Sequence, residues 1–504
     1  MKTPTLGTIS RIALTAGLLI GLCGCASGPR STPNAVKGLL NVTLDGDTRE
    51  WPVEAAVAAD TQFVYFRMSV ENEQFTLQAA PESMVLLLDC DASTATGRTT
   101  NLQPLDRLGV DLEVRFSPMQ ANGRRKNGVQ ITSFDAYGTA QPVKMSDLDF
   151  LCSPTYSSSW YEARISRTPG ATDLIPFSGM RSEGALSGLW AIEDASGKVV
   201  GYSDPFTLEL GAAADTPMKF TADLPQKPEN GLRVMTMNVH DSSTMKNPQV
   251  FARVFQAIDP DVMLFQEWDE GDEAAVLAWF TAMMPREGGW HVHKGPGTKQ
   301  NGGGVVVVSA YPLKGVLEQL AYPTKNDKVE TSQKSVRFAA ARISTPIGPM
   351  IAGSTHLKCC GTKDSREDKQ RMEESKAIAS AMRAAASGDA SAIRVVGGDM
   401  NLVGSRPPLD LLRAGADSDG SDLAVVEAFV LGDRSMYTWA DDGEGFAPGR
   451  LDYLVHSDAN TRVVNAFVLD TSRLSEESLA RLGLDATDSA STDHRPVVVD
   501  LVKK

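Results

Sequence analysis

The sequence predicts an exported protein of two domains, an all-β domain followed by an α/β domain. The chain has 504 residues, more than one ordinary hydrophobic core organises. Its first part reads as short apolar strands separated by turns, whereas the part after residue 230 alternates strands with amphipathic helices. Hydrophobic residues make up 42% and charged residues 22%, a globular composition. The single long apolar run lies at the N-terminus, which excludes a polytopic membrane protein.

The charge balance restricts the partners. The chain carries 49 Lys+Arg against 63 Asp+Glu, a net charge of -14, and acidic residues are in excess in both predicted domains. Tight, non-specific binding of nucleic acid needs a basic surface. Nucleic acid is therefore not favoured as the substrate, although a local basic groove is compatible with this composition.

The first 24 residues have the form of an export signal. A positively charged start precedes an apolar stretch from Ile12 to Cys23, too short to span a bilayer comfortably. The stretch ends in Leu22-Cys23-Gly24-Cys25, which resembles the cleavage site of bacterial lipoproteins. The resemblance implies that Cys25 becomes the lipid-modified first residue and that residues 25–36 form a tether. The alternative is an ordinary secretory signal cleaved near Ala26.

Both alternatives predict a location outside the cytoplasm. Ala26 is not the Asp that usually retains lipoproteins at the inner membrane, so we expect attachment to the outer membrane, facing the periplasm or the cell surface. Cysteines there meet oxidising conditions. Cys90 and Cys152 are then either a disulfide or two buried thiols, and a bond between the adjacent Cys359 and Cys360 would be a vicinal disulfide.

Residues 37–210 predict an antiparallel β-sandwich. Short apolar segments recur between turns rich in Gly, Asp and Ser, and no convincing long helix interrupts them. The clearest of these predicted strands are 39–44, 63–70, 84–89 and 110–116.

Several segments of this domain resemble sugar-binding sandwich modules of the DOMON and family-nine carbohydrate-binding type. They are Leu44-Asp45-Gly46-Asp47 with Trp51, Leu88-Asp89-Cys90-Asp91 with Thr96-Gly97, and Trp160-Tyr161-Glu162-Ala163-Arg164-Ile165. The resemblance implies a glycan as partner, with Trp51 and Trp160 either stacking on sugar or packing in the core.

The turn that contains Asp89 and Asp91 has two interpretations. Alternate acidic side chains, together with Thr96, supply oxygen ligands of the kind that Ca²⁺ takes. An Asp-rich turn without a metal is the plainer interpretation.

Residues 211–230 are rich in Pro, Ala and Gly and predict a linker to a second domain, residues 231–504. In that domain we expect strands at 232–238, 262–267, 305–308, 350–356 and 393–397, and helices at 248–258 and 366–385. Polar side chains follow several of these strands, where α/β folds hold their chemistry. They are Asn238, Glu267, His356, Asp399, Asn401, Asp452, Asp493 and His494.

Seven segments in order resemble the endonuclease/exonuclease/phosphatase superfamily. They are Thr236-Met237-Asn238, Phe265-Gln266-Glu267, Ser354-Thr355-His356-Leu357, Gly397-Gly398-Asp399-Met400-Asn401, Tyr437-Thr438-Trp439, Arg450-Leu451-Asp452-Tyr453-Leu454 and Ser491-Thr492-Asp493-His494-Arg495-Pro496. Each segment is weak alone, but the ordered set is specific. The resemblance implies a four-layer α/β sandwich of two packed, mixed sheets and hydrolysis of a phosphoester.

The residue types suit a metal-dependent phosphodiesterase. Glu267 and Asn238 are hard oxygen ligands for Mg²⁺ or Mn²⁺, and the resemblance places Asp493 near the metal. His356 and His494 can donate hydrogen bonds to phosphoryl oxygens. By resemblance, Asp452 orients His494, and Asp399 with Asn401 positions or deprotonates the attacking water.

Other polar residues have plainer interpretations. His240, His291, His293 and His456 match no motif, so we interpret them as structural or exposed, and the acidic run 269–273 as a solvated turn before a helix. The basic residues Lys358, Lys363, Arg366 and Arg371 either meet substrate phosphate or form helix-surface pairs such as Glu367–Arg371.

The leading hypothesis is a lipid-anchored Mg²⁺-dependent phosphodiesterase. The alternatives are an extracellular nuclease or phosphatase, and a non-catalytic surface protein that binds through its β-sandwich. The sequence does not identify the substrate.

Overall fold

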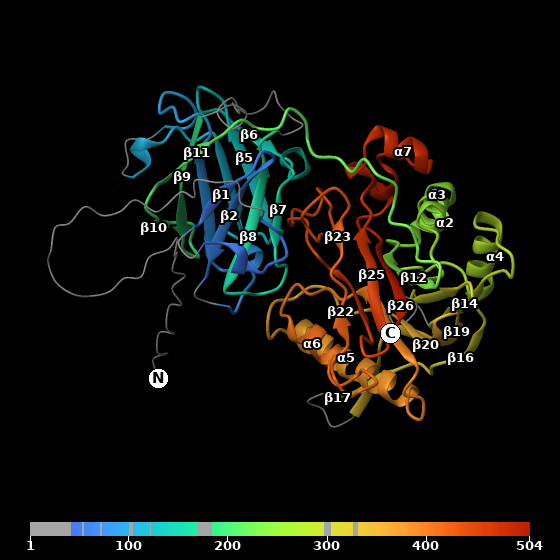
Figure 1. Ribbon diagram of the computed structural model, residues 1–504. Helices are drawn as coiled ribbons and strands as arrows, with labels where there is room; N and C mark the ends of the chain where they lie inside the picture. The colour runs from blue at the N-terminus through green and yellow to red at the C-terminus, as the bar shows by residue number, and fades with distance from the viewer. Residues whose placement is uncertain are drawn as a thin grey trace, which may run out of the picture. The chain divides into compact units, whose positions relative to one another are not determined.

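A computed structural model of the protein describes residues 42–52, 55–70, 73–99, 104–120, 122–168, 184–296, 304–325 and 331–504 (Figure 1). The chain forms two compact units: unit 1 is Met1–Pro217 with Asp441–Pro448, and unit 2 is Met218–Ala440 with Gly449–Lys504. The predicted signal peptide, Cys25 and the tether lie outside the described residues. Within the described ranges, no helix has both the length and the apolar character needed to cross a membrane.

Unit 1 is rich in strands, as predicted. Its smaller sheet has the order β1 (Val57–Ala59), β2 (Phe63–Ser69), β8 (Trp160–Ser166), β7 (Leu151–Ser153). Its larger sheet has the order β10 (Val199–Tyr202), β9 (Gly184–Glu193), β3 (Ser83–Asp89), β4 (Leu112–Phe116), β5 (Val129–Phe134), β6 (Ala140–Val143), and β11 (Phe206–Leu210) also pairs with β9. Short 3-10 turns occur at Thr48–Glu50, Leu77–Ala79, Leu105–Arg107 and Ser146–Leu148.

One hydrophobic cluster joins the two sheets of unit 1. Phe66 of β2 and Leu86 of β3 both belong to it, because alternate residues of each strand face the same core. Cys90 and Cys152 lie in this cluster as free, buried thiols rather than as a disulfide. Trp51 is also buried, and its indole N–H donates to Glu162 (2.6 Å), so it is not available to stack on a sugar.

The boundaries of the units differ from a simple division of the chain. Residues 218–230, which we predict as linker, contact unit 2: the main-chain N–H of Phe220 donates to the carbonyl of Arg473 (2.8 Å), and Leu224 is buried. Segment 441–448 belongs to unit 1, where the carbonyl of Gly445 accepts from the N–H of Val129 (2.7 Å). The strand predicted at 39–44 begins outside the described residues, and residues 42–44 form no strand beyond a single bridge at Leu44.

Unit 2 has the predicted α/β organisation, with two large mixed sheets. The first has the order β14 (His291–Lys294), β15 (Val306–Ser309), β13 (Val262–Gln266), β12 (Gly231–Asn238), β26 (Val497–Lys503), β25 (Thr461–Val468), β23 (Phe429–Val430). The second has the order β16 (Leu313–Val316), β19 (Phe338–Thr345), β20 (Gly348–His356), β21 (Ile393–Asp399), β24 (Asp452–His456), β22 (Ala424–Val425). A hairpin of β17 (Ala321–Lys325) and β18 (Thr331–Ser335) stands apart.

The helices of unit 2 include the two predicted at 248–258 and 366–385. They are α2 (Ser243–Lys246), α3 (Pro248–Ile258), α4 (Glu273–Met283), α5 (Arg366–Ala385), α6 (Pro407–Arg413) and α7 (Glu476–Leu482), with 3-10 turns at Thr471–Arg473 and Asp488–Ser491. The apolar face of α3, with Phe251 and Phe255, packs with Met235 and Met237 of β12 in one cluster. Because side chains alternate along a strand, Thr236 and Asn238 of β12 point the other way, toward the second sheet.

Buried polar side chains join the two sheets. β12 and β13 pack against β20 and β21. The amide nitrogen of Gln266 donates to the hydroxyls of Thr236 (3.2 Å) and Ser354 (3.0 Å), and Ser354 donates to the carbonyl of Phe265 (2.6 Å). Gly397 lies opposite Thr236, where an added Cβ would be 2.9 Å from the Cβ of Thr236. These contacts bring the ends of both sheets together at the residues described next.

Candidate active site

Three predicted site residues form one row across the second sheet. In the strand pairing, His356 of β20 lies opposite Asp399 of β21, and Asp399 lies opposite Asp452 of β24. Residues in register on neighbouring strands share a face of the sheet. The preceding Gly398 has φ +157°, and a Cβ there would be 1.8 Å from the carbonyl oxygen of Thr355. Glycine at position 398 therefore permits the close approach to Thr355 that places Asp399 in line with His356 and Asp452.

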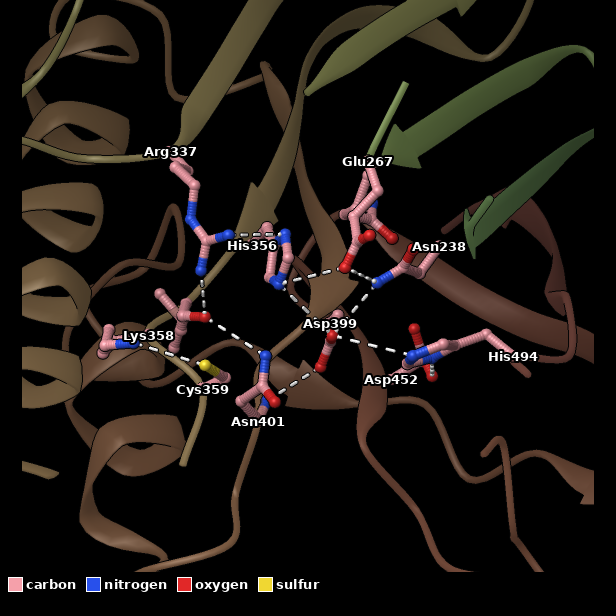
Figure 2. A network of polar contacts seen from close by, with 12 residues as sticks. Asn238, Glu267, Arg337, His356, Lys358, Cys359, Asp399, Asn401, Asp452 and His494 are labelled. Carbon is pink, nitrogen blue, oxygen red and sulfur yellow. Dashed lines mark hydrogen bonds and ion pairs between the residues drawn. The ribbon is translucent and has the colours of Figure 1, made fainter. Parts of the chain in front are cut away.

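Asp399 is the centre of the site (Figure 2). It is 3% exposed, and its Oδ2 lies 3.5 Å from Nε2 of His356 and 3.8 Å from Nε2 of His494. Its Oδ1 accepts the main-chain N–H of Asn401 (3.0 Å). Burial raises the pKa of Asp399 to about 7, and the carboxylates of Asp452 and Glu267 add to this rise while His494 opposes it.

The imidazole ring of His494 is hydrogen-bonded to Asp452. Its Nδ1–H donates to Oδ2 of Asp452 (2.7 Å), and both side chains are buried. Burial lowers the pKa of His494, but Asp452, Asp399 and Asp493 together raise it to about 10. The surrounding carboxylates therefore favour the protonated form of the imidazole, and Nε2 of His494 lies 3.8 Å from Oδ2 of Asp399. The orienting role that the family resemblance assigns to Asp452 stays a prediction.

Arg337 positions the imidazole ring of His356. Arg337 lies outside every motif recognised in the sequence. Nη1 of Arg337 lies 2.9 Å from Nδ1 of His356, and its Nη2 donates to the carbonyl of Leu357 (2.7 Å). A guanidinium can only donate, so Nδ1 of His356 accepts and its proton is on Nε2. Arg337 immediately precedes β19, and its carbonyl accepts the main-chain N–H of His356 (3.0 Å). Strand pairing alone therefore brings the two residues together.

Glu267 and Asn238 come from the first sheet. The amide nitrogen of Asn238 donates to Oε1 of Glu267 (3.2 Å) and to Oδ2 of Asp399 (3.2 Å). Its Oδ1 accepts the main-chain N–H of His240 (3.0 Å). Glu267 has φ +58° and Asn401 φ +47°, a left-handed conformation that is uncommon outside glycine and clusters at functional sites.

A cluster of hard oxygen ligands surrounds Glu267. One carboxylate oxygen from each of Asp241, Glu267 and Asp269 lies within 4.8 Å of the others. Such a set of acidic groups fits a divalent cation of the Mg²⁺ or Mn²⁺ type. Asp269, which the sequence suggested was part of a solvated turn, belongs to this cluster, whereas its neighbour Asp272 caps α4 by accepting the N–H of Ala275 (2.9 Å).

The motif around Thr438 positions two acidic residues. The hydroxyl of Thr438 accepts the N–H of Asp452 (2.9 Å), and the indole N–H of Trp439 donates to Oδ2 of Asp493 (2.9 Å). Oδ1 of Asp493 lies 2.9 Å from Nδ1 of His240. Burial raises the pKa of Asp493, but His494, Trp439 and His240 outweigh it and lower the pKa overall. His240, for which no motif was found, is therefore a neighbour of the site.

The basic residues after His356 do not all face a substrate. Arg371 is wholly buried and pairs with Asp368 (2.8 Å), not with Glu367, and it also donates to the carbonyls of Lys358 and Cys360. The phosphate-contact and surface-pair interpretations are both wrong for this residue, because α5 turns it toward the loop that follows His356. Cys359 and Cys360 are free thiols, and their sulfurs lie 3.0 Å apart.

Comparisons with known proteins identify the family of this chain. The model of the Endonuclease/Exonuclease/phosphatase family matches residues 235–494, about half of the chain, so the protein belongs to this family. Family members are hydrolases that act on phosphoester bonds and typically use a divalent metal. No curated protein matches the chain.

The solved structures that match include sphingomyelinase C from Streptomyces griseocarneus, at 18% identity and a TM-score of 0.36, covering 54% of this chain and 99% of that one. Beta toxin from Staphylococcus aureus has 18% identity and a TM-score of 0.35, with 53% and 99% covered. The human Nocturnin catalytic domain has 16% identity and a TM-score of 0.36, with 58% and 100% covered.

Replacing Arg337 with Met should lower kcat by roughly 10²-fold, because His356 loses the donor that keeps its proton on Nε2. Arg337→Lys retains a donor and should recover part of the rate. Arg342, an exposed arginine on β19, the strand that Arg337 immediately precedes, provides the control Arg342→Met, which should leave the rate unchanged. Steady-state kinetics on a chromogenic diester check this, and equal rates for the two Met variants would remove Arg337 from the site.

Proposed function

We propose that the protein is an exported, metal-dependent phosphodiesterase in which Asp399, His494 and His356 act on the scissile phosphoester. The observation that carries the proposal is the position of Asp399 between two imidazole Nε2 atoms, at 3.5 and 3.8 Å. Each imidazole is fixed through its Nδ1, by Arg337 on one side and Asp452 on the other. A carboxylate that can take a proton thus lies beside a cation that can give one.

The proposed reaction assigns one role to each group. Asp399 accepts a proton from the water that attacks phosphorus, and the main-chain N–H of Asn401 holds that carboxylate in place. The ester P–O bond breaks on the opposite side, and His494 donates its Nε2 proton to the leaving oxygen. His356, with its proton on Nε2, donates a hydrogen bond to a phosphoryl oxygen. Asp452 and Arg337 are positioning residues.

The metal would be held by Glu267, with Asp241 and Asp269 as the oxygen ligands that cluster with it. When bound, a divalent cation neutralises the negative charge that otherwise repels a nucleophile from a phosphodiester. Asn238, a predicted metal ligand, presents its amide nitrogen to Glu267 and Asp399, and its part at the metal stays a prediction. Asp493, the other predicted metal neighbour, has both oxygens engaged by Trp439 and His240, and its part at the metal remains a prediction.

One panel of substrates tests the function. The purified protein is incubated with DNA, RNA, sphingomyelin, inositol phosphates and bis-p-nitrophenyl phosphate, each with Mg²⁺, Mn²⁺ or EDTA. We expect hydrolysis of at least one diester that EDTA abolishes. Absence of turnover on every substrate, with retained folding, would favour the alternative of a non-catalytic surface binder.

We also infer that the layers of unit 2 form the four-layer α/β sandwich of the family, and that unit 1 is an all-β sandwich with a glycan as partner. Unit 1 contains a cavity of about 280 Å³ on its larger sheet. Apolar Leu87 and Val110 line it together with the charged side chains of Arg98, Glu113 and Arg115, a mixture that suits a polar ligand with apolar faces. Pull-down of the full chain on immobilised polysaccharides tests the glycan proposal.

Lipid attachment at Cys25 is the proposed basis of membrane localisation. A Cys25→Ser variant should lose metabolic labelling by fatty acid and move from the membrane to the soluble fraction, because no acylated cysteine remains at the new N-terminus. Cys23→Ser is the matched control and should keep both properties. Unchanged labelling of Cys25→Ser would show that the protein is not a lipoprotein of this type.

A further inference from the structure

A second group of carboxylates lies in unit 1. Asp89 ends β3, Asp91 follows in the turn, and Asp111 directly precedes β4, where its main-chain N–H donates to the carbonyl of Leu88 (2.8 Å). One carboxylate oxygen from each of the three lies within 4.8 Å of the others. Asp89 is 2% exposed and Asp111 is 0% exposed.

No basic side chain in the described part of the chain neutralises this group. Asp89 accepts main-chain N–H groups of Ser93 and Gly109, and Asp91 accepts from Ser93 and from the hydroxyl of Thr96. The nearby Arg98 pairs with Glu113 instead (2.9 Å). Carboxylates that share a buried site without a counter-charge strongly destabilise a fold unless a proton or a cation compensates them.

Asp111 distinguishes this group from an ordinary acidic turn. Its Oδ2 accepts the main-chain N–H of Cys90 (2.8 Å), but its buried Oδ1 has no hydrogen-bond partner. A buried carboxylate oxygen normally finds a donor, so an oxygen left open beside two further carboxylates indicates a ligand that the protein does not itself supply. The loop reaches this atom closely: a Cβ at Gly97, which has φ +71°, would be 2.8 Å from Oδ1 of Asp111.

We propose that Asp89, Asp91 and Asp111 bind one Ca²⁺ ion that joins β3 to β4. The donor set is entirely oxygen, which selects a hard cation over Zn²⁺ or Cu²⁺. Because two of the three carboxylates are buried, the protein itself must supply most of the coordination. Ca²⁺ accepts six to eight oxygen ligands in flexible geometry, whereas Mg²⁺ prefers to keep several waters. The ion would stabilise unit 1, and it has no part in the reaction proposed at Glu267.

Calorimetric titration of the full-length protein tests the site. The protein is stripped with EDTA and then titrated with CaCl₂ in millimolar Mg²⁺, which keeps the catalytic cluster occupied. Wild type should bind one equivalent of Ca²⁺. Asp111→Asn, which keeps the shape and removes one charge, should weaken the affinity at least about tenfold. Asp135→Asn is the control, because Asp135 is likewise a turn carboxylate of unit 1 that accepts main-chain N–H groups but is exposed.

The catalytic site and the folding of the variants are controlled separately. Glu267→Gln should retain the Ca²⁺ equivalent, and Asp111→Asn should hydrolyse substrate at the wild-type rate. If Asp111→Asn does not fold, the Ca²⁺ titration is repeated with Asp91→Asn, since Asp91 is the more accessible of the carboxylates. Absence of Ca²⁺ binding in wild type, equal binding in wild type and the folded Asp variant, or loss of binding in Glu267→Gln alone would each overturn the proposal.

Discussion

His494→Ala should lower kcat by about 10²–10⁴-fold and change KM far less, because the variant loses the group that protonates the leaving oxygen. Nδ1 of His494 lies 2.7 Å from Oδ2 of Asp452, and its Nε2 lies 3.8 Å from Oδ2 of Asp399. His291→Ala is the control, since His291 lies on the edge strand β14 rather than in the site. Equal behaviour of the two folded variants would refute the assignment of His494.

The pH profile separates proton donation from a structural role. The carboxylate of Asp452 helps to raise the pKa of His494 to about 10, so the activity should fall as the pH rises through that value and the imidazole loses its proton. Asp452→Asn removes the negative charge, lowers the pKa of His494, and should move this alkaline limb to lower pH. If Asp452→Asn is slower but its alkaline limb stays at the same pH as in wild type, Asp452 only supports the fold.

Glu267→Gln should raise the concentration of Mg²⁺ needed for half-maximal rate at least about tenfold, because a neutral amide is a weaker ligand than a carboxylate. Saturating Mg²⁺ should recover part of the rate, and EDTA should abolish the activity of wild type. Glu270→Gln is the matched control, since it makes the same change three residues away on an exposed side chain. If both variants titrate with Mg²⁺ as wild type does, the metal is held elsewhere.

Much of unit 2 can be predicted from periodicity. The helices predicted at 248–258 and 366–385 have those bounds in the structure. In α3 the buried residues are apolar and recur every three to four positions, whereas the first half of α5 buries polar side chains such as Asp368, Arg371 and Glu374. The polar residues at strand ends are also visible in the sequence, and the structure gathers His356, Asp399, Asp452 and His494 within hydrogen-bonding or near-contact distance. His356 and Asp399 end β20 and β21, and Asp452 begins β24, whereas His494 lies in the segment before β26.

The partners of residues that lie outside the motifs could not be predicted without the fold. Arg337 reaches His356 only through the pairing of β19 with β20, and Arg371 is buried because α5 packs its side chain against the loop after Leu357. The charge of an arginine does not tell from the sequence whether its partner is a phosphate, a carbonyl or an imidazole. Surface and buried arginines therefore look alike until the chain is folded.

The sequence by itself determined the two-part organisation, the α/β character of unit 2, the family and the acidic and imidazole groups available to it. Local patterns carry this information, since burial of a strand or of a helix face leaves a short period in the chain. Only the tertiary structure decided which nitrogen of His356 holds the proton, that Asp269 joins Glu267, and that Asp111 lies beside Asp89 and Asp91. Those facts depend on the distance between groups far apart in sequence, which strand register and the packing of sheets determine.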